Sequence, residues 1–347
     1  MEDRPKSFLI INPFGIGDVL FSLPLISNLK KNFPSCKVFY LCNRRTQPLL
    51  ENFFLINKTF VYERDEFEAV KKRSRFSWIR KIGSFISAIK KENIAIAIDL
   101  SLSSQFGFFA WAAGIKQRIG YDYKKRGRFL TKKISLKGYE AKHVIEYYRE
   151  LLKLIGLKPE YQKTRLTLTA TQKNNAANFL SQQGIGNDDL LITITPCGGA
   201  SWGRDSYRKH WPGIKFAELA DRLINQCEVR IILAGSSSER ETIEAIEGLM
   251  QNKPVKAIDL PLLDFLALLQ RSALLIANDG GPVHMGVFSG IKTVSIFGPV
   301  SEVVYGPYPE DSQKHGVIKK DLSCRPCYKK FRLPECLYQL KCLKSIT

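Results

Sequence analysis

Two glycines and an aspartate separate an apolar run from an amphipathic stretch in residues 8–31, FLIINPFGIGDVLFSLPLISNLKK. A strand, a glycine turn and a helix in this order hold a pyrophosphate in dinucleotide-binding proteins. Here the match is only G-x-G-x-x-L, because Leu20 replaces the third glycine, and no acidic residue ends the strand expected at 37–42. A nicotinamide site is therefore not favoured, and Asp18 remains an acid at a helix start, where it caps the helix or complements its dipole.

A second glycine pair follows a strand-like run in residues 277–299, ANDGGPVHMGVFSGIKTVSIFGP. Gly280 and Gly281 allow a ligand to approach the backbone, and the helix that follows offers free N–H groups to a phosphate. Asp279 directly precedes this pair, and His284 falls on the first turn of the helix. The pattern predicts a phosphate-binding loop, in which His284 either contacts the ligand or packs in the interior.

A cluster of cysteines near the C-terminus has the spacing C-x₂-C-x₈-C-x₅-C. Its members are Cys324, Cys327, Cys336 and Cys342. Four thiols suit a tetrahedral zinc ion, which would clamp the tail rather than take part in chemistry. The alternative is four reduced cysteines in a packed terminal segment. The other four cysteines are scattered, as expected of reduced thiols in the cytoplasm.

The elements that must position these residues follow a repeated βα pattern. In the first half, strands are expected at 8–12, 37–42 and 94–100, with helices near 18–32, 104–114 and 142–155. In the second half, strands are expected at 190–196, 229–235, 274–279 and 293–299, with helices at 214–226 and 238–250. Runs such as IAIAIDL and VRIILAG are apolar throughout, which is typical of strands covered on both faces in a parallel sheet. The sequence therefore predicts two doubly wound α/β domains.

Length and charge narrow the possible partners. The chain has 347 residues, enough for two cores, and a formal net charge of +20. Residues 1–160 hold 30 basic and 15 acidic side chains, whereas residues 161–347 hold 23 and 18. This excess fits nucleic acid, an anionic membrane surface or an acidic substrate, and it argues against a cationic partner. No signal peptide is visible, and the apolar run 106–115 has about half of the ~20 residues needed to cross a bilayer, so we expect a buried helix there and a cytoplasmic protein.

Four separated motifs together resemble the ADP-heptose:lipopolysaccharide heptosyltransferases, glycosyltransferase family nine. They are GIGDVLFSLPLISNLKK (15–31), AGIKQRIGY (113–121), RKHWP (208–212) and NDGGPVHMGVFSGIKTVSIFGP (278–299). Their order and spacing cover nearly the whole chain, and the cysteine-rich tail is similar to that of many enzymes that add the second heptose. The resemblance implies a GT-B fold, with two Rossmann-like domains, 1–165 for the acceptor and 166–347 for the nucleotide sugar, facing a central cleft.

The resemblance also implies roles for single residues. Asp18 would be the base that takes the proton from the attacking hydroxyl in an inverting sugar transfer. Lys209 matches the phosphate-binding lysine of the family, although a solvated surface lysine is the alternative. Asp279, Gly280 and Gly281 match the nucleotide-sugar loop, with Asp279 facing sugar or ribose hydroxyls. Glu239 is a candidate for the ribose, because it follows the strand end at 235; its alternative role is to place a charge at the start of the next helix.

Residues 70–93 form a basic amphipathic stretch, with apolar side chains at helical spacing from Trp78 to Ile89 and eight flanking Lys or Arg residues. The apolar stripe is expected to face the domain core. The charges, among them Lys71, Lys72, Arg73 and Arg75, are either a solvated face or a surface for the anionic acceptor and membrane lipid that the resemblance implies.

The resulting hypothesis is an inverting glycosyltransferase that moves L-glycero-D-manno-heptose from ADP-heptose to the inner core of lipopolysaccharide, peripheral on the inner membrane. No cofactor is expected for the chemistry. One alternative is a GT-B enzyme with another nucleotide sugar. The other is a basic nucleic-acid or membrane binding module, which leaves Asp18 without a use and lacks any recognisable nucleic-acid motif, so no nucleic-acid partner is expected.

Overall fold

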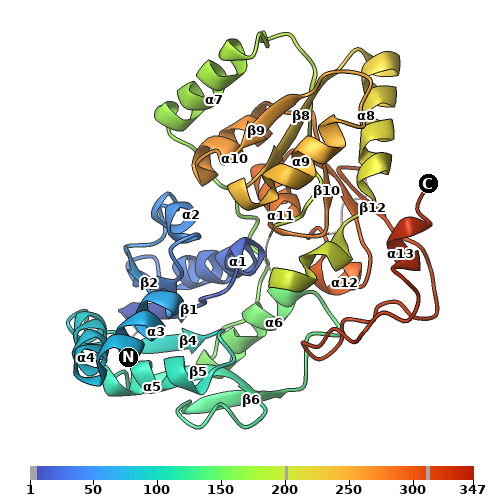
Figure 1. The fold of residues 1–347 in the computed structure, drawn as a ribbon. Helices are drawn as coiled ribbons and strands as arrows, with labels where there is room; N and C mark the ends of the chain where they lie inside the picture. The colour runs from blue at the N-terminus through green and yellow to red at the C-terminus, as the bar shows by residue number, and fades with distance from the viewer. Residues whose placement is uncertain (1–5, 200–201, 310–312) are drawn as a thin grey trace. The chain divides into compact units, whose positions relative to one another are not determined.

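The computed structural model describes residues 6–199, 202–309 and 313–347. The chain divides into two compact units (Figure 1). The first extends to Tyr139 and resumes over Val144–Thr164, and the second comprises Glu140–His143 and Arg165–Thr347. The division after Thr164 lies one residue from the predicted boundary, whereas the transfer of Glu140–His143 to the second unit was not foreseen.

The first unit is a sheet of parallel strands in the order β3-β2-β1-β4-β5-β6 with helices between them. Its elements are β1 (Ser7–Ile11), α1 (Ile16–Asn32), β2 (Lys37–Cys42), α2 (Gln47–Glu51), β3 (Lys58–Val61), α3 (Arg64–Arg73), α4 (Arg75–Lys90), β4 (Ile96–Asp99), α5 (Ser104–Ala112), β5 (Gln117–Tyr123), β6 (Lys132–Leu136), α6 (Val144–Glu150) and the 3₁₀ turn η1 (Leu151–Ile155). The central strand β1 is buried along its whole length, because helices cover both of its faces.

The second unit repeats this architecture with the strand order β12-β11-β10-β7-β8-β9. Its elements are α7 (Ala170–Gln182), β7 (Leu191–Thr195), η2 (Gly203–Lys209), α8 (Gly213–Cys227), β8 (Arg230–Gly235), η3 (Ser237–Glu239), α9 (Arg240–Glu247), β9 (Val255–Ile258), α10 (Leu262–Arg271), β10 (Leu274–Asn278), α11 (Gly281–Ser289), β11 (Lys292–Ile296), α12 (Glu302–Tyr305), β12 (His315–Ile318) and α13 (Lys341–Lys344). Two doubly wound parallel sheets confirm the predicted fold class.

Two of the predicted helices differ from the observed ones. The segment 106–115 was expected to be a buried helix, yet α5 leaves Phe108 and Trp111 on the surface, 37% and 53% exposed. These two rings pack on each other and on Phe129 instead of entering the core. The helix expected at 142–155 begins at Val144 and continues beyond Glu150 as the 3₁₀ turn η1.

Candidate active site

Asp18 lies at the point where the first sheet reverses its winding direction. Strands β1 and β4 are neighbours in the centre of the sheet, and the chain continues outward from each of them in opposite directions. In doubly wound folds, ligands bind outside the carboxyl ends of the strands at this switch point. Asp18 is on the first turn of α1, directly after β1, and is half-buried. Asp18 therefore lies at the sheet edge where doubly wound folds bind their ligands.

The side chain of Asn12 holds the turn that leads into α1. The N-cap of α1 is Gly15, which has no side chain to cap the helix. The buried amide of Asn12 donates from Nδ2 to the backbone oxygen of Asp18 at 2.9 Å and accepts from the N–H of Phe14 at 3.3 Å. Asn12 thus fixes the turn that presents Asp18.

A second carboxylate, Asp99, ends the neighbouring strand β4 and was not singled out from the sequence. Its Oδ1 accepts from the backbone N–H and the hydroxyl of Ser101, at 2.9 and 2.5 Å. Burial raises the pKa of Asp99 to about 6 despite these bonds. Burial, and then the charges of Asp18 and Asp99 among others, raise the pKa of the Tyr139 phenol. Both acids therefore act on the environment of Tyr139.

The glycine loops of the second unit meet at its own switch point, between β7 and β10. A Cβ on Gly280 would lie 1.8 Å from the backbone oxygen of Gly198, so only glycine permits this approach. Gly198 itself has φ +69°, and a Cβ there would lie 3.0 Å from the backbone oxygen of Asp279. The segment after β7 and the loop before α11 are therefore packed backbone against backbone.

Lys209 reaches this loop from the end of η2. Its Nζ lies 2.8 Å from Oδ2 of Asp279, and both side chains are largely buried, 11% and 4% exposed. The next residues are held by Asn278, which accepts from the N–H of Trp211 at 3.0 Å and donates to the backbone oxygen of Pro196. Lys209 is thus a buried, ion-paired cation, and the surface-lysine alternative is wrong.

His284 is buried in the first turn of α11, 5% exposed. Burial, and then the positive charge of Lys209, lower the pKa of His284 to about 3. The imidazole is therefore neutral at physiological pH, and the positive charge of the site comes from Lys209 and the N-terminus of α11.

Glu239 also contacts the glycine segment after β7. Its Oε1 accepts from the N–H of Gly199 at 3.1 Å, and its Oε2 accepts from the N–H and the hydroxyl of Ser236, both at 2.8 Å. These bonds form a capping box at η3 and hold the carboxylate at the carboxyl end of β8. The second unit thus brings together Lys209, Asp279, the glycines and His284, with Glu239 at the next loop.

The four C-terminal cysteines are free thiols, of which Cys342 is buried and the others half-buried. Burial, and then neighbouring thiols, raise the pKa of Cys327 and of Cys342. Among the residues that the structure describes, no three His, Cys, Asp or Glu side chains converge to hold a metal ion. Among the described residues, the four thiols therefore do not take the tetrahedral arrangement that a zinc ion would need.

The basic stretch of the first unit is divided between two helices. Lys71, Lys72 and Arg73 end α3, and Arg75 begins α4 after Ser74, whose hydroxyl caps the helix by accepting from the N–H of Ser77 at 3.2 Å. The four basic side chains are exposed. The apolar stripe packs on the core only from Ile82 onward. Ile79, expected in the core, is 61% exposed, and Phe76 beside it is 77% exposed.

Comparison with known proteins identifies the family of this chain. The sequence pattern of glycosyltransferase family 9 (heptosyltransferase) matches residues 82–337. Lipopolysaccharide heptosyltransferase 3 of Escherichia coli K12 is 22% identical over 300 residues, 85% of this chain and 83% of that protein. Lipooligosaccharide heptosyltransferase 2 of Campylobacter jejuni is 23% identical over 339 residues, 96% of this chain and 92% of that protein.

A solved structure shares the fold. The Escherichia coli ADP-heptose lps heptosyltransferase II superposes with a TM-score of 0.75 at 20% identity, over 91% of each chain. Across the described residues, no helix has both the length and the apolarity to cross a membrane. Because the family pattern covers more than half of the chain, the chain belongs to glycosyltransferase family 9, the heptosyltransferase family, and is a glycosyltransferase with the GT-B fold.

Proposed function

We propose that the protein transfers L-glycero-D-manno-heptose from ADP-heptose to the inner core of lipopolysaccharide, with inversion at the anomeric carbon. The observation that carries the donor half of this proposal is the buried Lys209–Asp279 pair beside the glycine loop. A cation, free helix N–H groups and close backbone approach are together the features that bind a diphosphate. The choice of heptose as the sugar and of lipopolysaccharide as the acceptor rests on the names of the relatives given above.

In the second unit, Lys209 and the backbone N–H groups at the start of α11 bind the diphosphate and stabilise the charge that develops on departing ADP. Asp279 holds the lysine and accepts hydrogen bonds from the sugar or ribose. Glu239 is assigned to the ribose hydroxyls, although its two oxygens already accept backbone N–H groups. The neutral His284 supports the donor through hydrogen bonding, since it carries no charge.

In the first unit, Asp18 is the general base. The acceptor oxygen bonds to the anomeric carbon as the bond from that carbon to the phosphate oxygen breaks. The hydroxyl proton passes to the Asp18 carboxylate, and ADP leaves with the bonding electron pair. Its position at the switch point of the sheet, presented by Asn12, supports this role.

A panel of donors and acceptors tests the proposal, with release of free nucleotide as the readout. The expected result is turnover with ADP-heptose and a heptose-deficient lipopolysaccharide core, and none with UDP or GDP sugars. Efficient transfer from another nucleotide sugar, with ADP-heptose inert, would establish the alternative donor. Nucleotide release in the absence of any acceptor would indicate hydrolysis instead.

Transfer is expected to continue when divalent metals are removed. Lys209 and the N-terminus of α11 already supply the positive charge that a leaving diphosphate needs. We expect turnover after dialysis against EDTA to stay within about twofold of the untreated enzyme. Rapid loss of turnover that magnesium alone restores would show that a metal shares this task.

The basic surface of α3 and α4 is proposed to contact the anionic acceptor and the lipid headgroups at the inner membrane. Exposed Phe76 and Ile79 stand within this basic surface, an arrangement typical of helices that bind membrane interfaces. The charge excess of the N-terminal half also supports this location, because anionic lipids attract basic segments by about 1 kcal/mol per side chain.

Reversal of this charge is expected to weaken vesicle binding. The variant changes Lys71, Lys72, Arg73 and Arg75 to Glu, and a sedimentation assay with phosphatidylglycerol vesicles at low salt measures its binding. We expect at least a tenfold loss, a raised acceptor KM and an unchanged donor KM. The control reverses four exposed basic residues of the second unit, Lys173, Arg222, Arg230 and Lys253. Equal losses in the two variants would mean that only total charge matters.

A further inference from the structure

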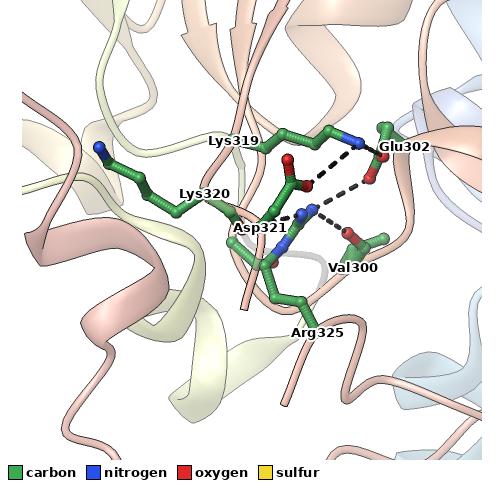
Figure 2. Close-up of polar contacts among 7 residues, drawn as sticks. Val300, Glu302, Lys319, Lys320, Asp321 and Arg325 are labelled. Atoms are coloured by element: carbon green, nitrogen blue, oxygen red, sulfur yellow. Dashed lines mark hydrogen bonds and ion pairs between the residues drawn. The ribbon is translucent and has the colours of Figure 1, made fainter. Parts of the chain in front are cut away.

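The C-terminal strap, residues 321–347, is latched to the second unit beside the end of β11. Arg325, almost fully buried, donates from Nε to the backbone oxygen of Gly298 at 2.5 Å. Its Nη2 donates to the backbone oxygen of Val300 at 3.1 Å and to Glu302 at 3.0 Å. Figure 2 shows this guanidinium between Val300 and Glu302, with Lys319 also reaching Glu302. The latch fixes the start of the strap.

The far end of the strap is fixed near the segment that follows Lys209. Leu343 packs into the core of the second unit and lies so close to Gly298 that a Cβ there would be 2.8 Å away. The indole Nε1 of Trp211 donates to the backbone oxygen of Ile346 at 3.2 Å. Arg208, buried next to Lys209, donates to the backbone oxygen of Pro334. The strap is therefore an ordered part of this unit.

Between these anchors, an aromatic contact connects the strap to the ion-paired lysine. The backbone N–H of Tyr328 donates to Pro299 at 3.0 Å, and its ring packs on Trp202 with centroids 5.0 Å apart. The face of Trp202 in turn covers Lys209, whose Nζ lies 4.3 Å from the indole centroid. The ammonium of Lys209 thus has the carboxylate of Asp279 and the indole of Trp202 as neighbours.

We propose that Trp202 and Tyr328 are positioning residues for Lys209, and that the strap is thereby part of the donor site. The inference rests on the proposed contact of Lys209 with the donor diphosphate. Lysine has a long, flexible side chain, so an unsupported ammonium loses conformational freedom when it binds a phosphate. A cation–π contact orders the ammonium beforehand and leaves its N–H donors available. Tyr328 packs on the indole and keeps it in place.

Binding of ADP and of adenosine separates positioning from direct contact. Trp202→Ala is expected to weaken ADP binding roughly 3- to 30-fold in calorimetry, the range of one cation–π contact. Adenosine, which lacks phosphates, is expected to bind equally to both proteins in ligand-observed NMR. Trp202→Phe restores most of the ADP affinity, because it keeps an aromatic face. Tyr328→Ala is also expected to weaken ADP binding, whereas Tyr328→Phe is expected to leave it unchanged. The control is Tyr338→Ala, a change of the exposed tyrosine of the strap, which is expected to leave ADP binding unchanged.

A double-mutant cycle completes the test. In a Lys209→Met/Asp279→Asn background, which leaves no buried charge unpaired, Trp202→Ala is expected to cause no further loss of ADP affinity. A loss of full size in that background, or an equal loss for adenosine, would overturn the positioning role. Unchanged ADP affinity in Trp202→Ala would do the same. If Lys209→Met alone leaves ADP binding unchanged, the proposed contact between Lys209 and the donor diphosphate is wrong.

Discussion

Asp18→Asn is expected to lower kcat by roughly 10²–10⁴-fold, the usual contribution of a general base. Asparagine has the same shape as aspartate and leaves the turn held by Asn12 intact, since that bond goes to the backbone oxygen of residue 18. Removal of the carboxylate takes away the group proposed to accept the proton. Affinity for ADP is expected to stay within about twofold, because the donor loop belongs to the other unit.

The matched control for Asp18→Asn is Asp65→Asn. Asp65 is also an acid on the first turn of a helix, α3, and it is exposed. Both substitutions remove a favourable charge from a helix N-terminus, at a cost of about 0.3–1 kcal/mol in the free energy of unfolding. Only Asp18→Asn is expected to lose turnover. If it keeps near-normal kcat, the acid only stabilises its helix and the base lies elsewhere.

The central strands of both sheets are predictable from the sequence because they are covered on both faces. β2 begins and ends at the predicted residues, and β1, β7 and β10 differ by one residue at one or both ends. A strand buried on both faces consists almost entirely of apolar residues, and such a run is easily recognised in the sequence. Buried strands that alternate with helices form doubly wound parallel sheets, so these strands are enough to predict the fold class.

The edge strands and the interior strand β5 were not identified. β3, β6, β9 and β12 stand at the four ends of the two sheets and are only partly buried. A strand with one neighbour and an exposed face needs few apolar residues, so it has no continuous apolar run. β6, with the sequence KKISL, illustrates this, since only its last residue is buried.

The candidate site was predicted from short motifs, which reveal only residues that stand close together in the sequence. Asp279 and the glycines stand in one continuous stretch, and Lys209 was identified by the RKHWP match. Trp202, Tyr328 and Asn278 act through contacts between segments distant in sequence, which no spacing rule reveals. Asp99 did have a signal, an acid at the carboxyl end of an apolar strand, the same signal that marks Asp279.

The stripe from Trp78 to Ile89 shows a different limit. Periodicity identifies a helix and its apolar side, yet it does not say how far along the helix the core extends. α4 packs on the core through Ile82, Phe85 and Ile86, and the turn that carries Ile79 extends beyond it. An apolar residue that the pattern assigns to the core is therefore left on the surface among basic side chains.

Lys209→Met is expected to weaken ADP binding and to lower kcat/KM by roughly 10²–10³-fold, the cost of removing one preorganised donor to a developing charge. Binding and turnover fall together, because the ammonium contacts the diphosphate in both the ground state and the transition state. Initial rates over a range of ADP-heptose concentrations measure the donor KM and kcat. Unchanged donor KM and kcat would show that this lysine serves only Asp279.

A loss of stability must be separated from this loss of function. Lys209→Met leaves the buried carboxylate of Asp279 without its ion-pair partner, which costs about 3–5 kcal/mol in the free energy of unfolding. The double variant Lys209→Met/Asp279→Asn removes both charges and is expected to recover most of that stability in urea unfolding. It is not expected to recover ADP affinity, because no cation has returned to the loop. Recovery of ADP affinity along with stability would mean that the lysine only holds the site together.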